Sequence, residues 1–218
     1  MNAPAEKTTS ARGRRRNPRG EGGRLRDEIV RAATELLDES GDERTITLRS
    51  VARRVGIAAP SIYPHFADQP AIMFAVVAQE FGRLKEALLA AVAAAGDAPR
   101  DRLLAICHAY LDYAQEYPGR YRTMFGGLWV PDLEAVSLTH DEMLTLGAGT
   151  MQVLIDAMSD CVASGDVAST DPVADSAAVW VGIHGLAHLR VATPNYPFPA
   201  DIVERVFDSL AKLKPVDG

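Results

Sequence analysis

The sequence has no apolar run long enough to cross a membrane as a helix. A transmembrane helix needs about 20 consecutive, mostly apolar residues, and no such stretch occurs here. The N-terminal segment MNAPAEKTTSARGRRR is basic, but it is not followed by the apolar segment that a signal peptide has. We therefore expect a cytoplasmic chain with no membrane partner. Arginine outnumbers lysine by 19 to 4, which favours a bacterial source.

Cysteine is scarce, and the motifs of the common enzyme classes are missing. The two cysteines, Cys107 and Cys161, lie in apolar periodic segments, where a free thiol packs as a small hydrophobic side chain. We find no G-x-S-x-G elbow, no P-loop, no G-x-G-x-x-G after a strand and no H-E-x-x-H. The sequence thus predicts no catalytic residue and no cofactor.

Acidic residues outnumber basic ones in the whole chain, but not at its beginning. The net charge is −6; residues 1–70 carry 13 basic and 10 acidic side chains, whereas residues 71–218 carry 10 and 19. Residues 1–23 have almost no apolar side chains, so we expect a disordered arm there. A basic end on an acidic body indicates a polyanionic partner, and the alternative is a solvated tail. The arginines of this arm that we expect to bind such a polyanion are Arg12, Arg14, Arg15 and Arg16.

Alternation of apolar and polar residues, which is typical of strands, is not sustained anywhere, whereas apolar residues recur at helical spacing. We predict an all-α fold of about nine helices, with an N-terminal three-helix module that contains a helix-turn-helix and a C-terminal helical bundle. Capping residues and glycine or proline breaks set the limits of the helices. The expected helices cover residues 24–40, 48–55, a short segment from Pro60, 70–95, 101–117, 119–125, 132–163, 172–192 and 201–213.

The segment TITLRSVARRVGIAAPSIYPHF predicts two short helices joined by a turn at Gly56. Thr47 is a suitable N-cap for the first of them. Pro60 tolerates an early helical position, and Pro64 cannot donate a hydrogen bond to the Pro60 carbonyl, so the second helix should span barely two turns. A helix-turn-helix presents the start of its second helix to the DNA major groove. A helical corner inside a bundle would give the same pattern.

The region from residue 24 to residue 73 resembles the DNA-binding domain of TetR-family transcriptional regulators. The recurring pattern of that family is I-x-x-A-A-x-x-L-(F/L), a glycine, T-(V/L)-x-x-(I/V)-A-x-x-(A/V)-G, a small turn and (L/I)-Y-x-H-F. The residues that match in register are Ile29, Ala32, Ala33, Leu36, Leu37, Gly41, Thr47, Leu48, Val51, Ala52, Val55, Gly56, Ile62, Tyr63, His65 and Phe66.

The resemblance implies which residues contact DNA. Arg49 matches a base-contacting position, and arginine can pair bidentately with guanine. Two positions depart from the family pattern: Gln69 replaces a common phosphate-binding lysine, and Ala58 replaces a polar N-cap. The implied DNA contacts are Thr47, Arg49, Ala59, Pro60, Ser61, Tyr63 and His65.

A second resemblance lies in the C-terminal half. The segment WVGIHG, which begins at Trp180, is similar to the Trp-His-Gly (WHG) signature of one subclass of TetR-family effector domains. In this family the helix with that segment and the last helix form a dimer interface, and a two-fold dimer suits a palindromic operator. The resemblance therefore implies a homodimer, with Trp180, His184, Val206 and Phe207 at the interface.

The histidines at positions 184 and 188 allow three interpretations. Their spacing places both imidazoles on one helix face, as in many metal sites. No cysteine or glutamate nearby in the sequence completes a ligand set, so a histidine of the core or of an interface fits as well. We predict no metal, and an all-helical metal-dependent enzyme is the alternative from another functional class.

The resemblance also implies a small-molecule pocket in the C-terminal part. We expect a basic arm in residues 1–23, a DNA-binding domain in 24–70 and a ligand-binding and dimerisation domain in 71–218. The predicted function is a repressor that an unknown small molecule releases from its operator; a DNA-binding protein that responds to no ligand is another alternative. Large or polarizable side chains are candidates for the pocket: Tyr110, Tyr113, Met124, Phe125, Trp129, Met143 and Met151.

Overall fold

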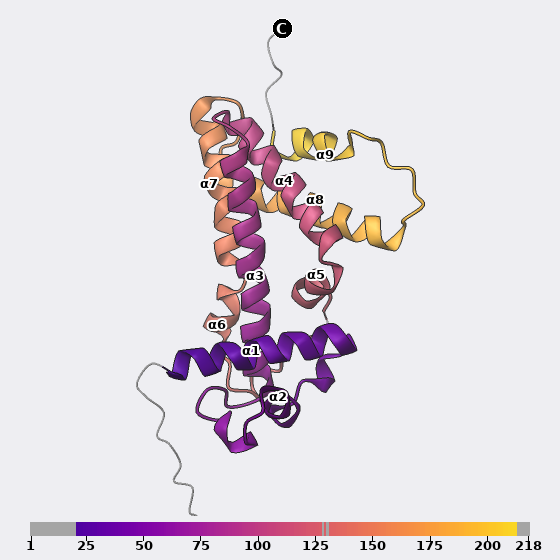
Figure 1. Cartoon of the computed structure of the whole chain (residues 1–218). Helices are drawn as coiled ribbons and strands as arrows, with labels where there is room; N and C mark the ends of the chain where they lie inside the picture. The colour runs from indigo at the N-terminus through magenta and orange to yellow at the C-terminus, as the bar shows by residue number, and fades with distance from the viewer. Residues whose placement is uncertain (1–20, 128, 130, 213–218) are drawn as a thin grey trace, which may run out of the picture.

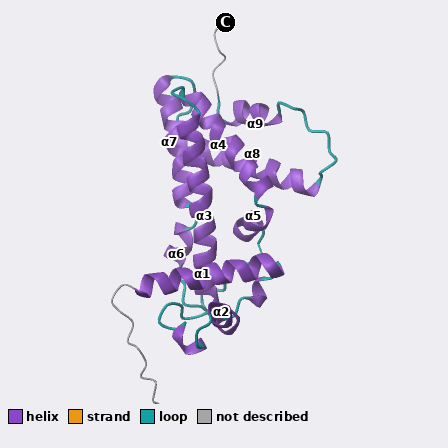
Figure 2. Cartoon of the chain, in the orientation of Figure 1, coloured by secondary structure: helices purple, strands orange, loops and turns teal. Residues whose placement is uncertain are grey.

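The structure consists of α-helices, as predicted. The computed structural model describes residues 21–127, 129 and 131–212, and within these ranges it has nine α-helices and no strand (Figures 1 and 2). The helices are α1 (Glu21–Ser40), α2 (Leu48–Val55), α3 (Gln69–Ala94), α4 (Pro99–Glu116), α5 (Pro118–Phe125), α6 (His140–Thr145), α7 (Ala148–Ser164), α8 (Pro172–Ala192) and α9 (Ile202–Leu210), and the short 3₁₀ turns are η1 (Glu43–Thr45) and η2 (Ala59–Ser61).

Helix α1 begins three residues earlier than predicted. Residues 21–23, which we assigned to the N-terminal arm, are its first residues. Glycine is a poor helix former, so the two glycines at positions 22 and 23 concealed this start in the sequence.

Side-chain caps fix the starts of three helices, as their sequences predict. Thr47 and Ser50 form a capping box at α2, in which each hydroxyl accepts a hydrogen bond from the other residue's backbone N–H, at 3.0 and 2.9 Å. The carboxylates of Asp68 and Asp171 cap α3 and α8 by accepting backbone N–H groups at 2.9 and 3.1 Å. Each such cap is worth about 1 kcal/mol.

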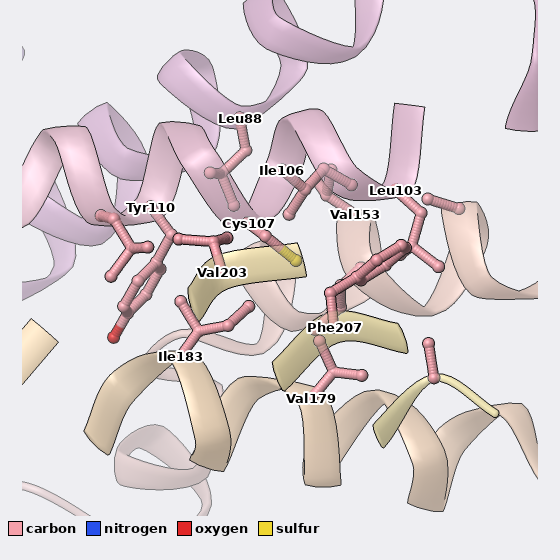
Figure 3. Packing of buried hydrophobic residues seen from close by; sticks show 14 of the residues in the cluster. Leu88, Leu103, Ile106, Cys107, Tyr110, Val153, Val179, Ile183, Val203 and Phe207 are labelled. Atoms are coloured by element: carbon pink, nitrogen blue, oxygen red, sulfur yellow. The ribbon is translucent and has the colours of Figure 1, made fainter. Parts of the chain in front are cut away.

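Two hydrophobic clusters form the core, and α3 contributes residues to both of them. Figure 1 shows α3 as a long helix that runs from the N-terminal module into the C-terminal bundle. The N-terminal cluster joins α1, α2, the turn that follows α2 and the first half of α3, where Ile72 and Met73 are buried. The C-terminal cluster joins the second half of α3, with Leu84 and Leu88, to α4, α5, α7, α8 and α9. Figure 3 shows part of it, with Phe207 of α9 among side chains of α4 and α8. Because α3 belongs to both clusters, a shift of this helix moves one cluster relative to the other.

The single helix predicted over residues 132–163 is wrong. An irregular segment covers residues 131–139, and α6 and α7 follow as separate helices. Thr139 and Glu142 form a capping box that starts α6. Gly147 then adopts φ +75° and separates α6 from α7. The apolar spacing was the same on both sides of these breaks, so periodicity alone could not reveal them.

Gly147 also allows a close approach between α7 and α3. A Cβ atom at this position would lie 2.9 Å from the Phe81 ring, which is too close for a real contact. Thr150 in the first turn of α7 donates its hydroxyl to the carbonyl of Phe81 at 3.2 Å. The start of α7 is thereby fixed against the middle of α3.

Both cysteines are free thiols buried in the C-terminal cluster. Burial raises the pKa of Cys107 and of Cys161 to about 12. In the part of the chain that the structure describes, none of the helices combines the length and the apolar character that a membrane span requires.

Candidate functional site

The predicted DNA contacts lie on one small part of the N-terminal module, around α2 and the turn after it. Thr47, Arg49, Pro60 and Tyr63 are exposed, and Tyr63 keeps 61% of its surface. Their backbone is fixed from inside by Ile62 and Phe66, which are both buried, as predicted. The remaining predicted contacts are partly exposed, and they are Ala59, Ser61 and His65.

The expected recognition helix is a shorter structure than we predicted. It consists of the 3₁₀ turn η2, followed by turns up to His65. Its hydrogen bonds reach back three residues, from Ser61 N–H to Ala58 C=O at 2.8 Å and from His65 N–H to Ile62 C=O at 2.8 Å. A regular helix would need an N–H group at Pro64 to bond the Pro60 carbonyl, and proline has none. Ala58 provides no side-chain cap, as its sequence position suggested.

The hydroxyl of Thr47 and the side chain of Arg49 differ in their freedom to bind DNA. The Thr47 hydroxyl already caps α2 through Ser50. Arg49 forms no ion pair or side-chain hydrogen bond with any described residue, and neither does Arg53, one turn further along the same face of α2. By contrast, Arg54 is bound to Glu39 and Glu35 of α1. Sequence reasoning missed Arg53, although its four-residue spacing from Arg49 was a usable signal.

The start of α3 is tied to other parts of the protein. Gln69 donates its side-chain amide to the carbonyl of Glu43 at 3.2 Å, so this group is engaged within the module. Asp68 accepts a second hydrogen bond, from Ser137 N–H at 2.8 Å, in the connection between α5 and α6. Trp129, in the same connection, packs against the N-terminal cluster. The arginines predicted to bind DNA from the arm, at positions 12 and 14–16, lie outside the described residues.

Two adjacent cavities lie where α3 meets α5, α7 and α8. The inner one has a volume of about 250 Å³, and Phe125, Met151 and Trp180 line it. The outer one has about 210 Å³ and extends along α3 past Phe74 to Lys85. Both cavities are lined by the same four residues at their boundary: Phe81, Leu146, Gly147 and Thr150.

Only two of the seven predicted pocket residues, Phe125 and Met151, line these cavities. Met124 packs against the C-terminal cluster, and Trp129 packs against the N-terminal one. Met143 lies on α6 and lines neither cavity. Sequence reasoning missed the contributions of α3, because Phe81 has the same helical spacing as the core residues around it.

The two remaining pocket candidates, Tyr110 and Tyr113, are buried and hydrogen-bonded. The hydroxyls of Tyr110 and Tyr121 both lie within hydrogen-bond distance of His184 Nδ1, at 2.8 and 2.7 Å. Burial, and next the neighbouring His188, lower the pKa of His184, which favours a neutral ring. A neutral ring protonated on Nε2 has Nδ1 as an acceptor. This hydroxyl–imidazole group therefore joins α4, α5 and α8 behind the inner cavity.

A buried carboxylate lies on the other side of α5. Glu80 of α3 is only 1% exposed and binds Arg83 at 2.6 Å, with Arg120 of α5 at 3.7 Å. Tyr113 of α4 donates its hydroxyl to Glu80 at 3.3 Å. Burial raises the pKa of Glu80, although the two arginines oppose this effect. Glu80 thus connects α3, α4 and α5 by polar contacts within the protein interior.

Of the four predicted dimer residues, Phe207 is fully buried, whereas Trp180, His184 and Val206 are partly exposed and stay predictions. Phe207 has no exposed surface in a single chain and packs in the C-terminal cluster, so its assignment to an interface is wrong (Figure 3). Trp180 lines the inner cavity, and His184 binds the two tyrosines. Val206 packs beside Gly182, where an added Cβ would lie 3.0 Å from it.

The histidine pair does not belong to a larger ligand set. The rings of His184 and His188 lie with their centres 4.6 Å apart. Among residues 21–127, 129 and 131–212, no group of three or more histidine, cysteine, aspartate or glutamate side chains is placed to hold a metal ion.

The chain is similar to proteins of known sequence and, in its fold, to proteins of known structure. The HTH-type transcriptional regulator BetI of Stenotrophomonas maltophilia (strain R551-3) is 32% identical over 90 residues, which cover 41% of this chain and 45% of that protein. The chain thus matches about half the length of its curated relatives. A protein of unknown function from Rhodococcus sp. RHA1 superposes with a TM-score of 0.70 at 26% identity, covering 86% of this chain and 93% of that chain.

A regulator of the TetR/AcrR family from Thermobifida fusca YX-ER1 has the same fold, with a TM-score of 0.58 at 21% identity over 86% of this chain and 97% of that chain. The family model of the tetracyclin repressor-like C-terminal domain matches residues 103–213. That match covers just over half of the 218 residues. The protein therefore belongs to the TetR family of transcriptional regulators, which is a family of non-enzymes.

Proposed function

We propose that this protein is a homodimeric repressor that binds palindromic operator DNA and that a small molecule releases it. The proposal rests on one exposed surface, which Arg49, Pro60 and Tyr63 form. Arg49 has no ion-pair partner among the described residues. Arginine is well suited to read guanine in the major groove, and hydroxyl groups suit phosphate oxygens. We assign base contact to Arg49 and phosphate contact to Tyr63 and His65.

We propose that residues 21–70 bind DNA and that residues 71–218 bind the effector and the second subunit, with residues 1–20 as a basic arm. The division is supported by the two hydrophobic clusters, which meet along α3. The arm carries the arginines at positions 12 and 14–16, whose charges would add phosphate contacts and make binding depend on salt.

For the dimer, we propose the outward face of α8. Val173, Val181 and Leu189 recur every eight residues along this helix and are 58%, 62% and 49% exposed, although all three are apolar. At about 100° per residue, Val173 and Leu189 lie roughly 80° to either side of Val181, so Val181 is at the centre of this outward face and the other two are at its edges. A second subunit packed two-fold symmetrically on this face would bury it. The Trp-His-Gly type of effector domain stays a prediction, supported by the contact of the Trp180 and His184 rings, 5.3 Å apart.

The cavities beside α3 suggest how release would work. Phe81 separates them at the middle of α3, and the first half of the same helix belongs to the N-terminal cluster. A ligand that prefers one position of α3 would favour one distance between the two DNA-binding modules. Binding to consecutive major grooves requires about 34–36 Å, so a different distance lowers the affinity for DNA.

Selection of bound sequences from random DNA duplexes tests the proposal. We expect a palindromic sequence to be enriched and Arg49→Ala to lose discrimination at one base pair of each half-site, at a cost of about 1–3 kcal/mol. Arg205→Ala, which removes an exposed arginine of α9, is the control and should bind as the wild type does. No enriched sequence, or equal weakening of Arg49→Ala on all sequences, contradicts the assignment.

A further inference from the structure

The two cavities beside α3 form one elongated site with apolar walls. They share four lining residues, so a ligand that displaces the Phe81 ring can occupy both. The inner part offers the aromatic rings of Phe125 and Trp180, whose centres lie 6.3 Å apart, and the thioether of Met151. Walls of this kind bind apolar or aromatic groups.

The hydroxyl groups at this site are already engaged. Thr150 donates to the carbonyl of Phe81 at 3.2 Å, and Thr145 donates to the carbonyl of Glu142 at 2.6 Å. Behind the inner cavity, the two tyrosine hydroxyls are bound to His184. Their O–H donors are therefore in use, so these hydroxyls keep acceptor lone pairs but offer no donor to a carboxylate.

Lys85 is the exception. It is an exposed residue and the one charged side chain that lines either cavity, and it has no hydrogen bond or ion pair with any residue that the structure describes, so its ammonium group is free to pair with a ligand. Its ammonium group lies beside the start of α7, since a Cβ atom placed on Gly149 would be 3.4 Å from Nζ. Gly147 caps α7 without a side-chain acceptor, so the positive end of the helix dipole faces the same place. A cation beside a positive helix end is stabilised by an anion.

We propose that the effector is a carboxylic acid with an apolar or aromatic body, bound with its carboxylate on Lys85 and its body against Phe125, Met151 and Trp180. This inference rests on the proposed function, because it takes these cavities as the effector site. An amine lacks a partner here, because no carboxylate lines either cavity in the described parts of the chain. A neutral ligand would fill the inner part but would leave the lysine unpaired.

Calorimetric titration of the full-length protein with matched probes tests the charge preference. The probes are hexanoate, octanoate, decanoate and 4-phenylbutyrate, each with its primary amide and its amine. We expect at least one acid to bind about 10- to 100-fold more tightly than its amide, the range for a hydrogen bond to a charged group. Lys85→Gln should remove this preference and leave the binding of the amide unchanged, whereas Lys85→Arg should keep it.

Arg190→Gln is the matched control, because Arg190 is a second cation without an ion pair in the described residues but lines a separate cavity between α4 and α8. It should bind the acids as the wild type does. The proposal is overturned if no acid binds at millimolar concentration, if amides bind as well as acids, or if Arg190→Gln rather than Lys85→Gln loses the preference.

Operator binding, measured separately with the selected duplex, distinguishes this inference from the proposed function. If the acids bind through Lys85 but leave the affinity for DNA unchanged, the ligand class is correct and the release mechanism is wrong. If a neutral or cationic compound releases the protein from DNA and the acids do not bind, the release mechanism stands and the ligand class is wrong.

Discussion

At the scale of single residues, Gly147 shows how one backbone conformation shapes the candidate effector site. Its positive φ angle ends the continuity between α6 and α7, and its missing side chain admits the Phe81 ring. Gly165 also has a positive φ angle, +86°, but an added Cβ would meet nothing within 4 Å. An alanine at position 165 would therefore cost only the strain of the backbone conformation. An alanine at position 147 would add the clash of its Cβ with Phe81.

We predict that Gly165→Ala lowers the free energy of unfolding by about 1 kcal/mol, the cost of a left-handed conformation with a side chain. Gly147→Ala should cost a further 1–3 kcal/mol or so, because it also overpacks the contact with Phe81. Denaturant unfolding of both variants measures the difference. Equal losses would mean that the Phe81 ring moves away freely, contrary to a fixed contact between α3 and α7.

Glu80 predicts a pH dependence of stability. Because burial raises the pKa of Glu80, the folded state binds its proton more tightly than the unfolded state does. Its contribution to stability is therefore fully present below the unfolded-state pKa of about 4.3 and is lost as the pH rises through the folded-state pKa. Relative to Glu80→Gln, the wild type should lose stability as the pH rises through this window.

Asp175 provides the control of opposite sign for the Glu80 experiment. The hydrogen bond from Lys212, and next that from Ser169, hold the pKa of Asp175 below its ordinary value. Relative to Asp175→Asn, the wild type should therefore gain stability as the pH rises towards the unfolded-state pKa. Thermal unfolding across the pH range checks both signs. If the difference in stability between the wild type and Glu80→Gln does not change with pH, the pKa of Glu80 is not raised.

At the scale of elements, helices with clear caps were predictable from the sequence, and those without them were not. The starts of α2, α3 and α8 follow from Thr47, Asp68 and Asp171, because a polar cap is a local signal. The break before α7 depends on a glycine conformation and on contact with α3, and neither is visible in apolar spacing. Likewise, the two prolines showed that the recognition segment is short, but not that it is a 3₁₀ turn.

Besides α3, the connection between α5 and α6 also links the two hydrophobic clusters. Trp129 packs on the N-terminal cluster, Ser137 binds Asp68, and the helix before the connection contributes Phe125 to the inner cavity. A change at the cavity thus has a second physical route to the DNA-binding module, besides the shared helix α3.

We predict that Trp129→Ala weakens the N-terminal module selectively. Removal of a partly buried tryptophan should cost about 2–3 kcal/mol, somewhat less than for a fully buried one. Amide hydrogen exchange should then become faster in α1, α2 and the first half of α3, while the amides of α4 and α8 keep their protection. Exchange that speeds up equally in both clusters, or in neither, would show that Trp129 does not support the module.

At the scale of the whole molecule, the fold was predictable from the sequence, whereas the residues that line the cavities were not. The proposed DNA contacts around Arg49 lie in one continuous segment, which the family pattern describes. The cavity combines side chains from α3, α5, α7 and α8, so sequence spacing could not bring Phe81 and Trp180 together. The interface was misplaced at Phe207 because an apolar stripe does not reveal which side faces its own core.

The proposed dimer predicts the effect of one charge on α8. Val181→Glu should produce a monomer, because a carboxylate would be buried without a partner at the centre of the interface. Leu144→Glu on α6, where the leucine is 66% exposed, is the matched control and should stay a dimer. Light scattering coupled to size-exclusion chromatography measures both masses. A dimeric Val181→Glu variant would exclude this face of α8 as the interface.

We propose that the two N-terminal modules of the ligand-free dimer bind two half-sites on one face of the DNA. This proposal is tested by the affinity for the selected palindrome before and after insertion of about five base pairs, half a helical turn, between the half-sites. We expect this insertion to reduce binding to the level of non-specific DNA. Insertion of a full turn should not restore the original affinity, because the ligand-free dimer holds its modules at one distance. Unchanged affinity after the half-turn insertion would exclude two modules held at one distance on one face of the DNA.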